Sequence, residues 1–283
     1  MKVFTFWEPR NKMPGYIRAC LGTWRFIPNA EVVVLDYETI KDYLPEDLFR
    51  ACTCRSMSLA MQSDAYRALL IERHGGVWLD ADTVVLPQIV DSDILSGRAE
   101  VTMFSRFGGV GNGVAFPAGA FIHAIAPHAA FMRRWAEAIP DRVAEFARYS
   151  GNPFLRLLSR PRWRIVRKWN YCVNAIIDPL VEHMSEREFL LLDMDKYGVF
   201  PECTTLSECS NYEYACRYEQ YYFSPGNAQE TIKASSGLIM LHNSWTPADF
   251  RAMSEDEFLS SDVRLAALLR QVLGNTPASA QAT

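Results

Sequence analysis

Residues 75–87 of the chain read Gly75-Gly76-Val77-Trp78-Leu79-Asp80-Ala81-Asp82-Thr83-Val84-Val85-Leu86-Pro87, and this stretch decides the fold. The apolar run that starts at Val77 is typical of a short buried strand. A helix is expected before it, over residues 57–73, because side chains recur there at helical spacing, and the glycine pair ends that helix. The stretch therefore predicts a helix, a turn and a strand that finishes at two carboxylates.

The preceding residues extend this alternation toward the N-terminus. We expect a strand at Val3–Trp7, a helix from Pro14 to about Phe26, a β-branched strand at Glu31–Asp36 and short helical pieces over residues 38–51. Alternating strands and helices predict an α/β fold, with a mostly parallel central sheet that helices flank on both faces. Ligands bind beyond the carboxyl ends of such strands, which is where the two carboxylates lie.

The later sequence is less regular. We expect a glycine-rich loop at Gly108–Gly113, a strand at Val114–Phe116, helical structure over residues 120–150 and 172–184, and a strand that ends at Leu241. Phe131, Met132 and Trp135 are core candidates.

One domain is expected over residues 1–271, divided into a first part at 1–116 and a second part at 117–271. Residues 272–283 are small and polar and are predicted to be a disordered tail.

Composition narrows the class of protein. The chain has 283 residues and a net charge of −4, so no overall basic field favours a nucleic-acid partner. No apolar run reaches the ~18 residues that a membrane-spanning helix requires. The opening residues predict no export signal. Seven cysteines without paired spacing then favour reduced thiols and a cytoplasmic protein.

Asp80 and Asp82 are the strongest candidates for chemistry. Residues i and i+2 of an extended segment point to the same side, so both carboxylates can approach one hard cation. A cation held there can neutralise the charge that grows on a diphosphate leaving group. The competing interpretation is a solvated acidic turn, but charges at the end of a buried strand are costly unless something pairs with them.

Asp64 and Arg67 form a second pair, at i and i+3 on one face of the expected helix. By themselves they also fit a surface ion pair that contributes about 0.2–0.5 kcal/mol.

The stretch from Ser63 to Asp82 resembles the signature of sugar transferases that carry an Asp-X-Asp motif. The likeness is greatest to the bacterial capsular polysaccharide synthesis family, and fungal α-mannosyltransferases and the glucosylating toxins of clostridia are more distant. Blocks at Phe6-Trp7-Glu8-Pro9, Pro14–Ile17, Thr23-Trp24 and Val32–Asp36 resemble the first segment of the capsular family. Leu241-His242-Asn243-Ser244-Trp245 resembles its C-terminal element. The likeness covers residues 1–116 and 238–247, and no motif covers 117–237.

This resemblance implies a GT-A-type nucleotide-sugar-binding fold, with a donor-binding part at 1–116 and an acceptor-binding or closing part at 117–271. It also implies a retaining transferase that moves a hexose from a nucleoside-diphosphate sugar, UDP favoured, to a saccharide or lipid-linked acceptor during synthesis of capsule or lipopolysaccharide. The cofactor would be Mn²⁺ or Mg²⁺.

The resemblance also implies roles for single residues. The metal would be held by Asp82, Asp80 and His242. Donor contacts would come from Trp7, Asp64, Arg67, Asp80 and Ser244. Asn112 would face the transferred sugar, and Trp245 would close over the donor.

Several alternatives stay open. His242 also fits a hydrogen-bonded histidine at a strand end, Trp7 and Trp245 fit core aromatics, and Asn112 fits a turn residue. A phosphohydrolase with an aspartate nucleophile would also place Asp-X-Asp at a strand end. A protein that binds nucleotide sugars without turnover is a third class.

The segment Arg156–Trp169 holds six basic residues, two tryptophans and no acidic residue. Basic residues interleaved with tryptophan suit an anionic membrane surface, so peripheral contact with the inner leaflet is a hypothesis, and a solvated helix and loop is the alternative.

Overall fold

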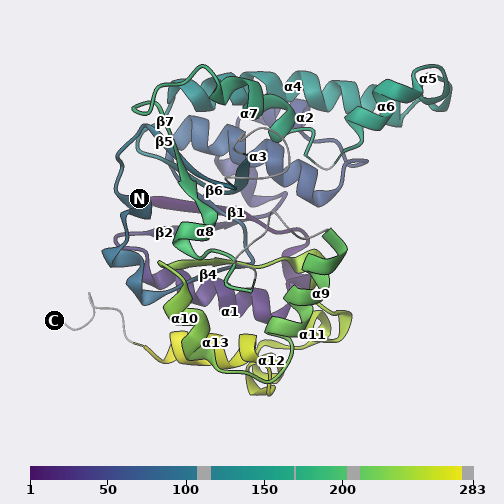
Figure 1. Cartoon of the computed structure of the whole chain (residues 1–283). Helices are drawn as coiled ribbons and strands as arrows, with labels where there is room; N and C mark the ends of the chain where they lie inside the picture. The colour runs from purple at the N-terminus through teal and green to yellow at the C-terminus, as the bar shows by residue number, and fades with distance from the viewer. Residues whose placement is uncertain (107–115, 169, 203–210, 276–283) are drawn as a thin grey trace.

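The structure is a computed structural model that describes residues 1–106, 116–168, 170–202 and 211–275. Strands form a six-stranded main sheet and a two-stranded second sheet (Figure 1). The main sheet contains β1 (Lys2–Phe6), β2 (Glu31–Leu35), β3 (Gly76–Leu79), β5 (Val101–Arg106), β6 (Phe116–Ala124) and β7 (Phe189–Asp193), and the second contains β4 (Thr83–Val85) and β8 (Leu238–Met240).

The α-helices are α1 (Gly15–Thr23), α2 (Glu46–Cys52), α3 (Leu59–His74), α4 (Ala130–Ser150), α5 (Pro153–Leu158), α6 (Arg160–Val166), α7 (Asn174–Val181), α8 (Met194–Tyr197), α9 (Asn211–Tyr222), α10 (Ala228–Ala234), α11 (Ala248–Ala252), α12 (Glu255–Ser260) and α13 (Arg264–Gly274). Short 3₁₀ segments include Trp24–Phe26, Thr39–Asp42 and Asn243–Trp245.

The main sheet has the strand order β2-β1-β3-β6-β5-β7. The pairs β1–β2, β1–β3 and β5–β7 are parallel, whereas β6 is antiparallel to both of its neighbours. Of the six described strands, β6 alone therefore runs in the opposite direction. The predicted α/β fold with a mostly parallel sheet is confirmed.

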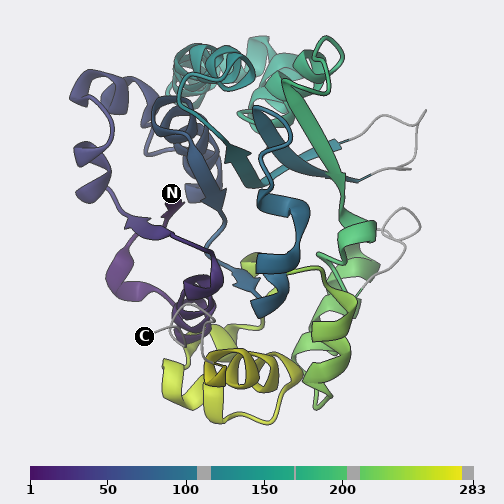
Figure 2. The same ribbon diagram turned by 90° about the vertical axis from the view of Figure 1, so that its left-hand side faces the viewer.

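Helices cover both faces of the sheet (Figure 1). Because side chains alternate along a strand, Trp78 packs with the core beneath α3 and α4, and Val77 and Leu79 pack with the opposite core of α1 and α13. Figure 2 shows the same layers from the side. Phe131, Met132 and Trp135 are fully buried, as predicted.

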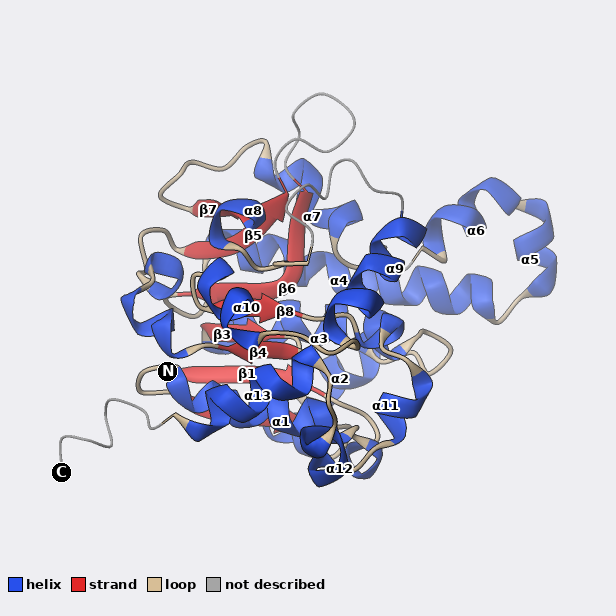
Figure 3. Cartoon of the chain, turned by 60° about the horizontal axis from the view of Figure 1, so that its bottom comes forward, coloured by secondary structure: helices blue, strands red, loops and turns tan. Residues whose placement is uncertain are grey.

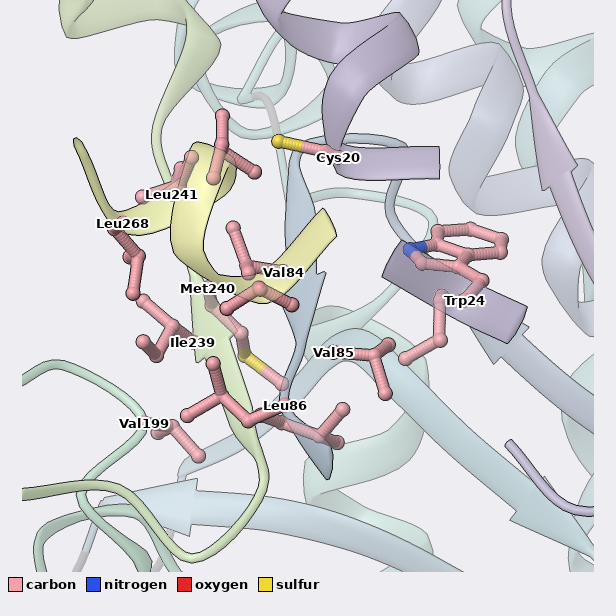
Figure 4. Packing of buried hydrophobic residues seen from close by; sticks show 14 of the residues in the cluster. Cys20, Trp24, Val84, Val85, Leu86, Val199, Ile239, Met240, Leu241 and Leu268 are labelled. Atoms are coloured by element: carbon pink, nitrogen blue, oxygen red, sulfur yellow. The ribbon is translucent and has the colours of Figure 1, made fainter. Parts of the chain in front are cut away.

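The second sheet joins two segments that are far apart in the sequence. Thr83 pairs with Met240, Val84 with Ile239 and Val85 with Leu238. Their apolar side chains pack with those of Trp24, Leu241 and Leu268 (Figure 4). Residues adjacent to Asp82 and His242 are thus fixed side by side, although they are far apart in the sequence.

Some predicted boundaries are right and others are wrong. α3 ends at Gly75, whose φ of 62° favours glycine, as the glycine pair predicted. Helical structure from residue 120 is wrong, because 120–124 belong to β6, which hydrogen-bonds to strands on both sides. The strand expected at Val114–Phe116 lies outside the described residues except for Phe116, where β6 begins.

The C-terminal tail also differs in detail from expectation. α13 continues to Gly274, so the tail predicted from residue 272 is helical over its first residues, because Val272 packs in the core; 276–283 lie outside the described residues. Cys20, Cys52, Cys54, Cys172 and Cys216 are free. Every helix in the described part of the chain is too short or too polar to traverse a bilayer.

Candidate active site

The Asp80–Thr83 turn is held in place by backbone bonds to its surroundings. The Asp80 amide donates to Ala120 O on β6 at 3.0 Å, and the Thr83 amide closes the turn by donating to Asp80 O at 3.0 Å. The Trp24 indole donates to Thr83 O at 2.8 Å. A strand end that is bonded on both sides presents the two carboxylates in a fixed geometry.

Asp80 lies at the centre of a charged and aromatic cluster. Its Oδ1 accepts a bond from the Trp78 indole at 2.9 Å and contacts Nη2 of Arg67 at 3.0 Å. The Arg67 guanidinium also lies over the Trp78 ring, 5.2 Å from its centroid. These contacts leave Oδ2 of Asp80 without a donor from another described residue.

Helix α3 supplies the cation of this cluster. Arg67 Nη2 contacts Asp64 Oδ1 at 3.0 Å, and both side chains are 7% exposed. The pair is buried, so the alternative of a surface ion pair is excluded. Burial raises the pKa of Asp64 to about 7 even though Arg67 acts to lower it. Gly119 on β6 makes room for the guanidinium, because a Cβ there would lie 2.6 Å from Arg67 Nη1.

Asp82 is bound to the C-terminal part of the chain. Its Oδ2 accepts the Asn243 amide at 2.8 Å, and its backbone oxygen accepts the Leu241 amide at 3.1 Å. The Tyr16 hydroxyl donates to Asn243 Oδ1 at 2.5 Å. Burial and the charge of Asp80 raise the pKa of Asp82 to about 7, and the bond from Asn243 opposes that rise.

A cavity of about 240 Å³ joins these elements. Trp7, Arg67, Asp80 and Asp82, all predicted from the sequence, line it. Trp7 follows β1, and its amide donates to Leu35 O at 2.8 Å, so its ring lies at the carboxyl ends of the strands. Both aspartates of the motif therefore face one cavity. The lining also includes Glu8, Ser63 and Asn243, which were not selected from the sequence.

His242 lies in an aromatic cluster next to the cavity. Its ring stacks on Phe200 at 5.3 Å between centroids and 7° between planes, and Trp245 lies 4.1 Å from it. His242 Nε2 and the Tyr214 hydroxyl are 3.2 Å apart, and the Tyr218 hydroxyl accepts the His242 amide at 3.2 Å. The neighbouring Asn243 reaches Asp82, so this cluster positions the C-terminal edge of the site.

The tyrosines of that cluster were missed by sequence reasoning. Tyr214, Tyr218 and Tyr222 recur every four residues on α9, which places them on one face of the helix. Glu202 accepts a hydroxyl bond from Tyr214 at 2.8 Å and from Tyr222 at 2.9 Å, and burial raises its pKa to about 7. The periodicity was the available signal, since it predicts a buried face.

The remaining predicted residues are not brought into the cavity. Ser244 is exposed, and Trp245 packs edge-on against Tyr214 at 5.0 Å between centroids. Asn112 lies outside the described residues. In the part of the chain that the structure describes, no three acidic, histidine or cysteine side chains converge, so His242 does not join the two aspartates as a third ligand in this conformation. Its metal role stays a prediction.

The charges around the turn fit a divalent cation. Asp64, Asp80, Asp82 and the nearby Glu8 supply four carboxylates, whereas Arg67 is the cation that contacts two of them. The raised pKa of Asp82 reflects this excess of buried negative charge. Asp80 Oδ2 and Asp82 Oδ1 accept no bond from another described residue, and carboxylate oxygens are the ligands that Mg²⁺ and Mn²⁺ prefer.

Residues 1–112 match the family model described as capsular polysaccharide synthesis protein. That segment contains Trp7, Asp64, Arg67, Asp80 and Asp82. No curated protein sequence matches the chain.

Three similar solved structures are glycosyltransferases or toxins. The galactosyltransferase LgtC, in complex with donor and acceptor sugar analogues, is 11% identical with a TM-score of 0.41, and the match covers 99% of each chain. The PaToxG glycosyltransferase is 11% identical with a TM-score of 0.34, covering 84% of this chain and 88% of that one. The catalytic domain of α-toxin from Clostridium novyi is 10% identical with a TM-score of 0.29, covering 88% and 55%.

The family match confirms the resemblance predicted from the sequence. Residues 1–112 carry the pattern of the capsular polysaccharide synthesis family.

Proposed function

We propose that this chain is a metal-dependent glycosyltransferase that transfers a hexose from a nucleoside-diphosphate sugar, UDP favoured, to a saccharide or lipid-linked acceptor in surface polysaccharide synthesis. The observation that carries the proposal is the single cavity lined by Trp7, Arg67, Asp80 and Asp82, all within the segment that matches the capsular family.

Asp80 and Asp82 would hold Mn²⁺ or Mg²⁺ through the oxygens that their protein partners leave free. When bound, such an ion neutralises the charge that develops on a departing diphosphate. Donor oxygens and water would fill other coordination positions, and a role for His242 as a further ligand stays a prediction.

Arg67 is positioned to bind the donor. Asp64 and Trp78 hold its guanidinium from two sides, so the side chain is ordered before the donor arrives. A fixed guanidinium loses less entropy when it binds phosphate or sugar oxygens than a mobile one. The Trp7 ring, which also lines the cavity, suits stacking with the base.

Retention of configuration follows from the resemblance, and the lining residues are compatible with it. Glu8 is the further acidic side chain among the described lining residues, and its Oε2 accepts the Tyr37 amide at 3.1 Å. In a retaining mechanism of the kind that the resemblance implies, the departing diphosphate itself would take the acceptor proton. The described lining contains no lysine, which weighs against a phosphohydrolase of the aspartate-nucleophile type.

A thermal-shift and turnover experiment tests the proposal. UDP at about 100 times its Kd, with Mn²⁺, should stabilise the wild type by about 2.7 kcal/mol, or roughly 5–10 °C in Tm. Asp82→Asn keeps an oxygen for the Asn243 amide and should lose both the Mn²⁺-dependent shift and donor hydrolysis. Asp262→Asn, at an exposed position, is the matched control and should behave as the wild type. Unchanged turnover of every donor by Asp82→Asn would exclude the metal role.

A further inference from the structure

Helices α5 and α6 form an arm that projects from the body of the protein. They follow α4 directly and extend beyond the layers of helices around the sheet (Figures 1 and 3). The arm covers most of the basic segment that the sequence singled out.

The outer side of α5 is apolar and exposed. Phe154, Leu157 and Leu158 are 66%, 70% and 65% exposed. Their spacing of i, i+3 and i+4 places them on one face of the helix. Leu155, by contrast, packs against the core. The arm therefore ends in a stripe of three large apolar side chains that the described part of the chain does not cover.

Basic side chains that have no ion-pair partner among the described residues lie next to this stripe. Arg160 and Arg164 are exposed and share one face of α6 at i and i+4, and Lys168 follows the helix. None of the three has an ion pair within the described residues. Residues 151–168 contain no acidic residue, whereas the whole chain has a net charge of −4. The arm is thus a basic and apolar segment of a chain that is acidic overall.

The base of the arm is fixed to α4. Arg162 donates from Nε and Nη2 to the two oxygens of Glu145 at 2.6 and 2.7 Å, and the Tyr171 hydroxyl donates to the same carboxylate. Trp163 stacks on Tyr149 at 6.3 Å between ring centroids. Arg162 and Trp163 therefore fix the arm to α4.

A cavity of about 450 Å³ lies where the arm meets the start of α3. Arg156 and Arg167 line it together with Ser56, Ser58 and Ser150, and no acidic residue contributes to the lining. Guanidinium and hydroxyl groups together suit a phosphate group. The basic surface therefore continues from α6 to the base of the arm.

We propose that the arm docks the enzyme on an anionic phospholipid bilayer, with Phe154, Leu157 and Leu158 entering the acyl boundary and Arg160, Arg164 and Lys168 contacting the headgroups. Apolar insertion and adjacent basic charge together are the two contributions that make peripheral membrane binding stable. The proposal rests on the proposed function only in its purpose, which is to bring the transferase to a lipid-linked acceptor.

Vesicle co-sedimentation of the full chain tests the proposal. Wild type should bind phosphatidylcholine vesicles that contain phosphatidylserine at least about tenfold more strongly than pure phosphatidylcholine vesicles, since each basic residue near the surface contributes about 1 kcal/mol. A Phe154→Ser/Leu157→Ser/Leu158→Ser variant should bind at least about tenfold more weakly, because three apolar side chains no longer leave water. An Arg160→Glu/Arg164→Glu/Lys168→Glu variant should lose the preference for anionic vesicles.

Two control variants carry equivalent changes away from the arm. Arg187→Glu/Lys233→Glu/Arg251→Glu reverses three exposed charges, and Val90→Ser/Ile125→Ser removes exposed apolar side chains. Both should bind vesicles as the wild type does. Hydrolysis of a soluble donor should be unchanged in all four variants, so a failure of the docking proposal is distinguishable from a failure of the enzyme assignment.

Wild type that ignores anionic vesicles, or arm variants that bind as strongly as wild type, would overturn the proposal. Sedimentation velocity gives a second readout. If the wild type forms a dimer that the serine variant abolishes and no vesicle binding occurs, the apolar stripe is an interface between copies of the chain instead.

Discussion

Replacing Arg67 with methionine removes the cation that Asp64 and Asp80 both contact at 3.0 Å. Methionine keeps an unbranched side chain that can pack against Trp78, so the variant chiefly deletes charge. Asp64, which is 5% exposed, then has no ion-pair partner within the described residues. Asp80 is 33% exposed in its side chain and can be solvated in part.

The size of the effect should depend on pH. Removing one partner of a buried ion pair costs about 3–5 kcal/mol, because the other charge stays buried. Burial already holds the pKa of Asp64 at about 7 in the native protein, against 3.8 for an ordinary aspartate, and loss of Arg67 raises it further. Near pH 5 the native Asp64 is neutral, so the variant should lose only about 1–2 kcal/mol of hydrogen bonding. The loss grows to the full 3–5 kcal/mol as the pH rises above 7.

Urea unfolding of wild type and Arg67→Met at about pH 5 and about pH 8.5 measures both values. Asp64→Asn provides the matched second change, because it removes the stranded charge and keeps the shape. The double variant Asp64→Asn/Arg67→Met should therefore recover about 2 kcal/mol or more at the higher pH relative to Arg67→Met.

Equal losses at both pH values would refute this reasoning. So would a double variant whose loss equals the sum of the two single losses at high pH, because the two side chains would then act independently.

Three further predictions concern the walls of the site. Gly119→Ala puts a Cβ 2.6 Å from Arg67 Nη1, so the variant should bind UDP about tenfold more weakly by titration calorimetry and lose about 1–3 kcal/mol of stability. The control Gly274→Ala, whose Cβ meets nothing within 4 Å, should change neither UDP affinity nor stability. Burial raises the pKa of Glu202 to about 7, so the charged form of this side chain destabilises the fold at high pH. Glu202→Gln should therefore be more stable than wild type by about 2 kcal/mol near pH 8.5 but not near pH 5. An equal difference in stability at the two pH values would contradict this prediction. Trp7→Ala should weaken UDP binding by about tenfold, since stacking on a base contributes about 1–3 kcal/mol, and unchanged affinity would remove Trp7 from the base site.

The N-terminal half of the fold was predictable because its signals are local. A glycine at a positive φ ended α3, a β-branched run made β2, and an apolar run made β3. Strands β5 and β7 were not predicted, and residues 120–124 of β6 were predicted as helix. β6 contains Pro117 and Gly119, and its apolar stretch fits a helix as well as a strand until β3 and β5 bond to it from both sides.

The residues of the candidate site also fall into those that local spacing predicts and those that only the tertiary structure brings together. Spacing alone placed Asp80 and Asp82 beyond a strand and Asp64 and Arg67 on one helical face, and the structure brings Arg67 and both aspartates of the motif to one cavity. Spacing could not pair Asp82 with Asn243, which are separated by 161 positions. Only tertiary packing decides such a contact. The family resemblance included the block Leu241–Trp245 but did not identify Asn243 as the partner of Asp82.

The β4–β8 ladder has a consequence for the order in which the protein is made. Its first strand leaves the ribosome soon after Asp82, but Asn243 emerges only 161 residues after Asp82. A nascent chain that already contains the whole of residues 1–112 still lacks the strand and the amide that secure the acidic turn. The turn is therefore fixed only after Asn243 has emerged, and a chain that stops before it contains the motif without these contacts.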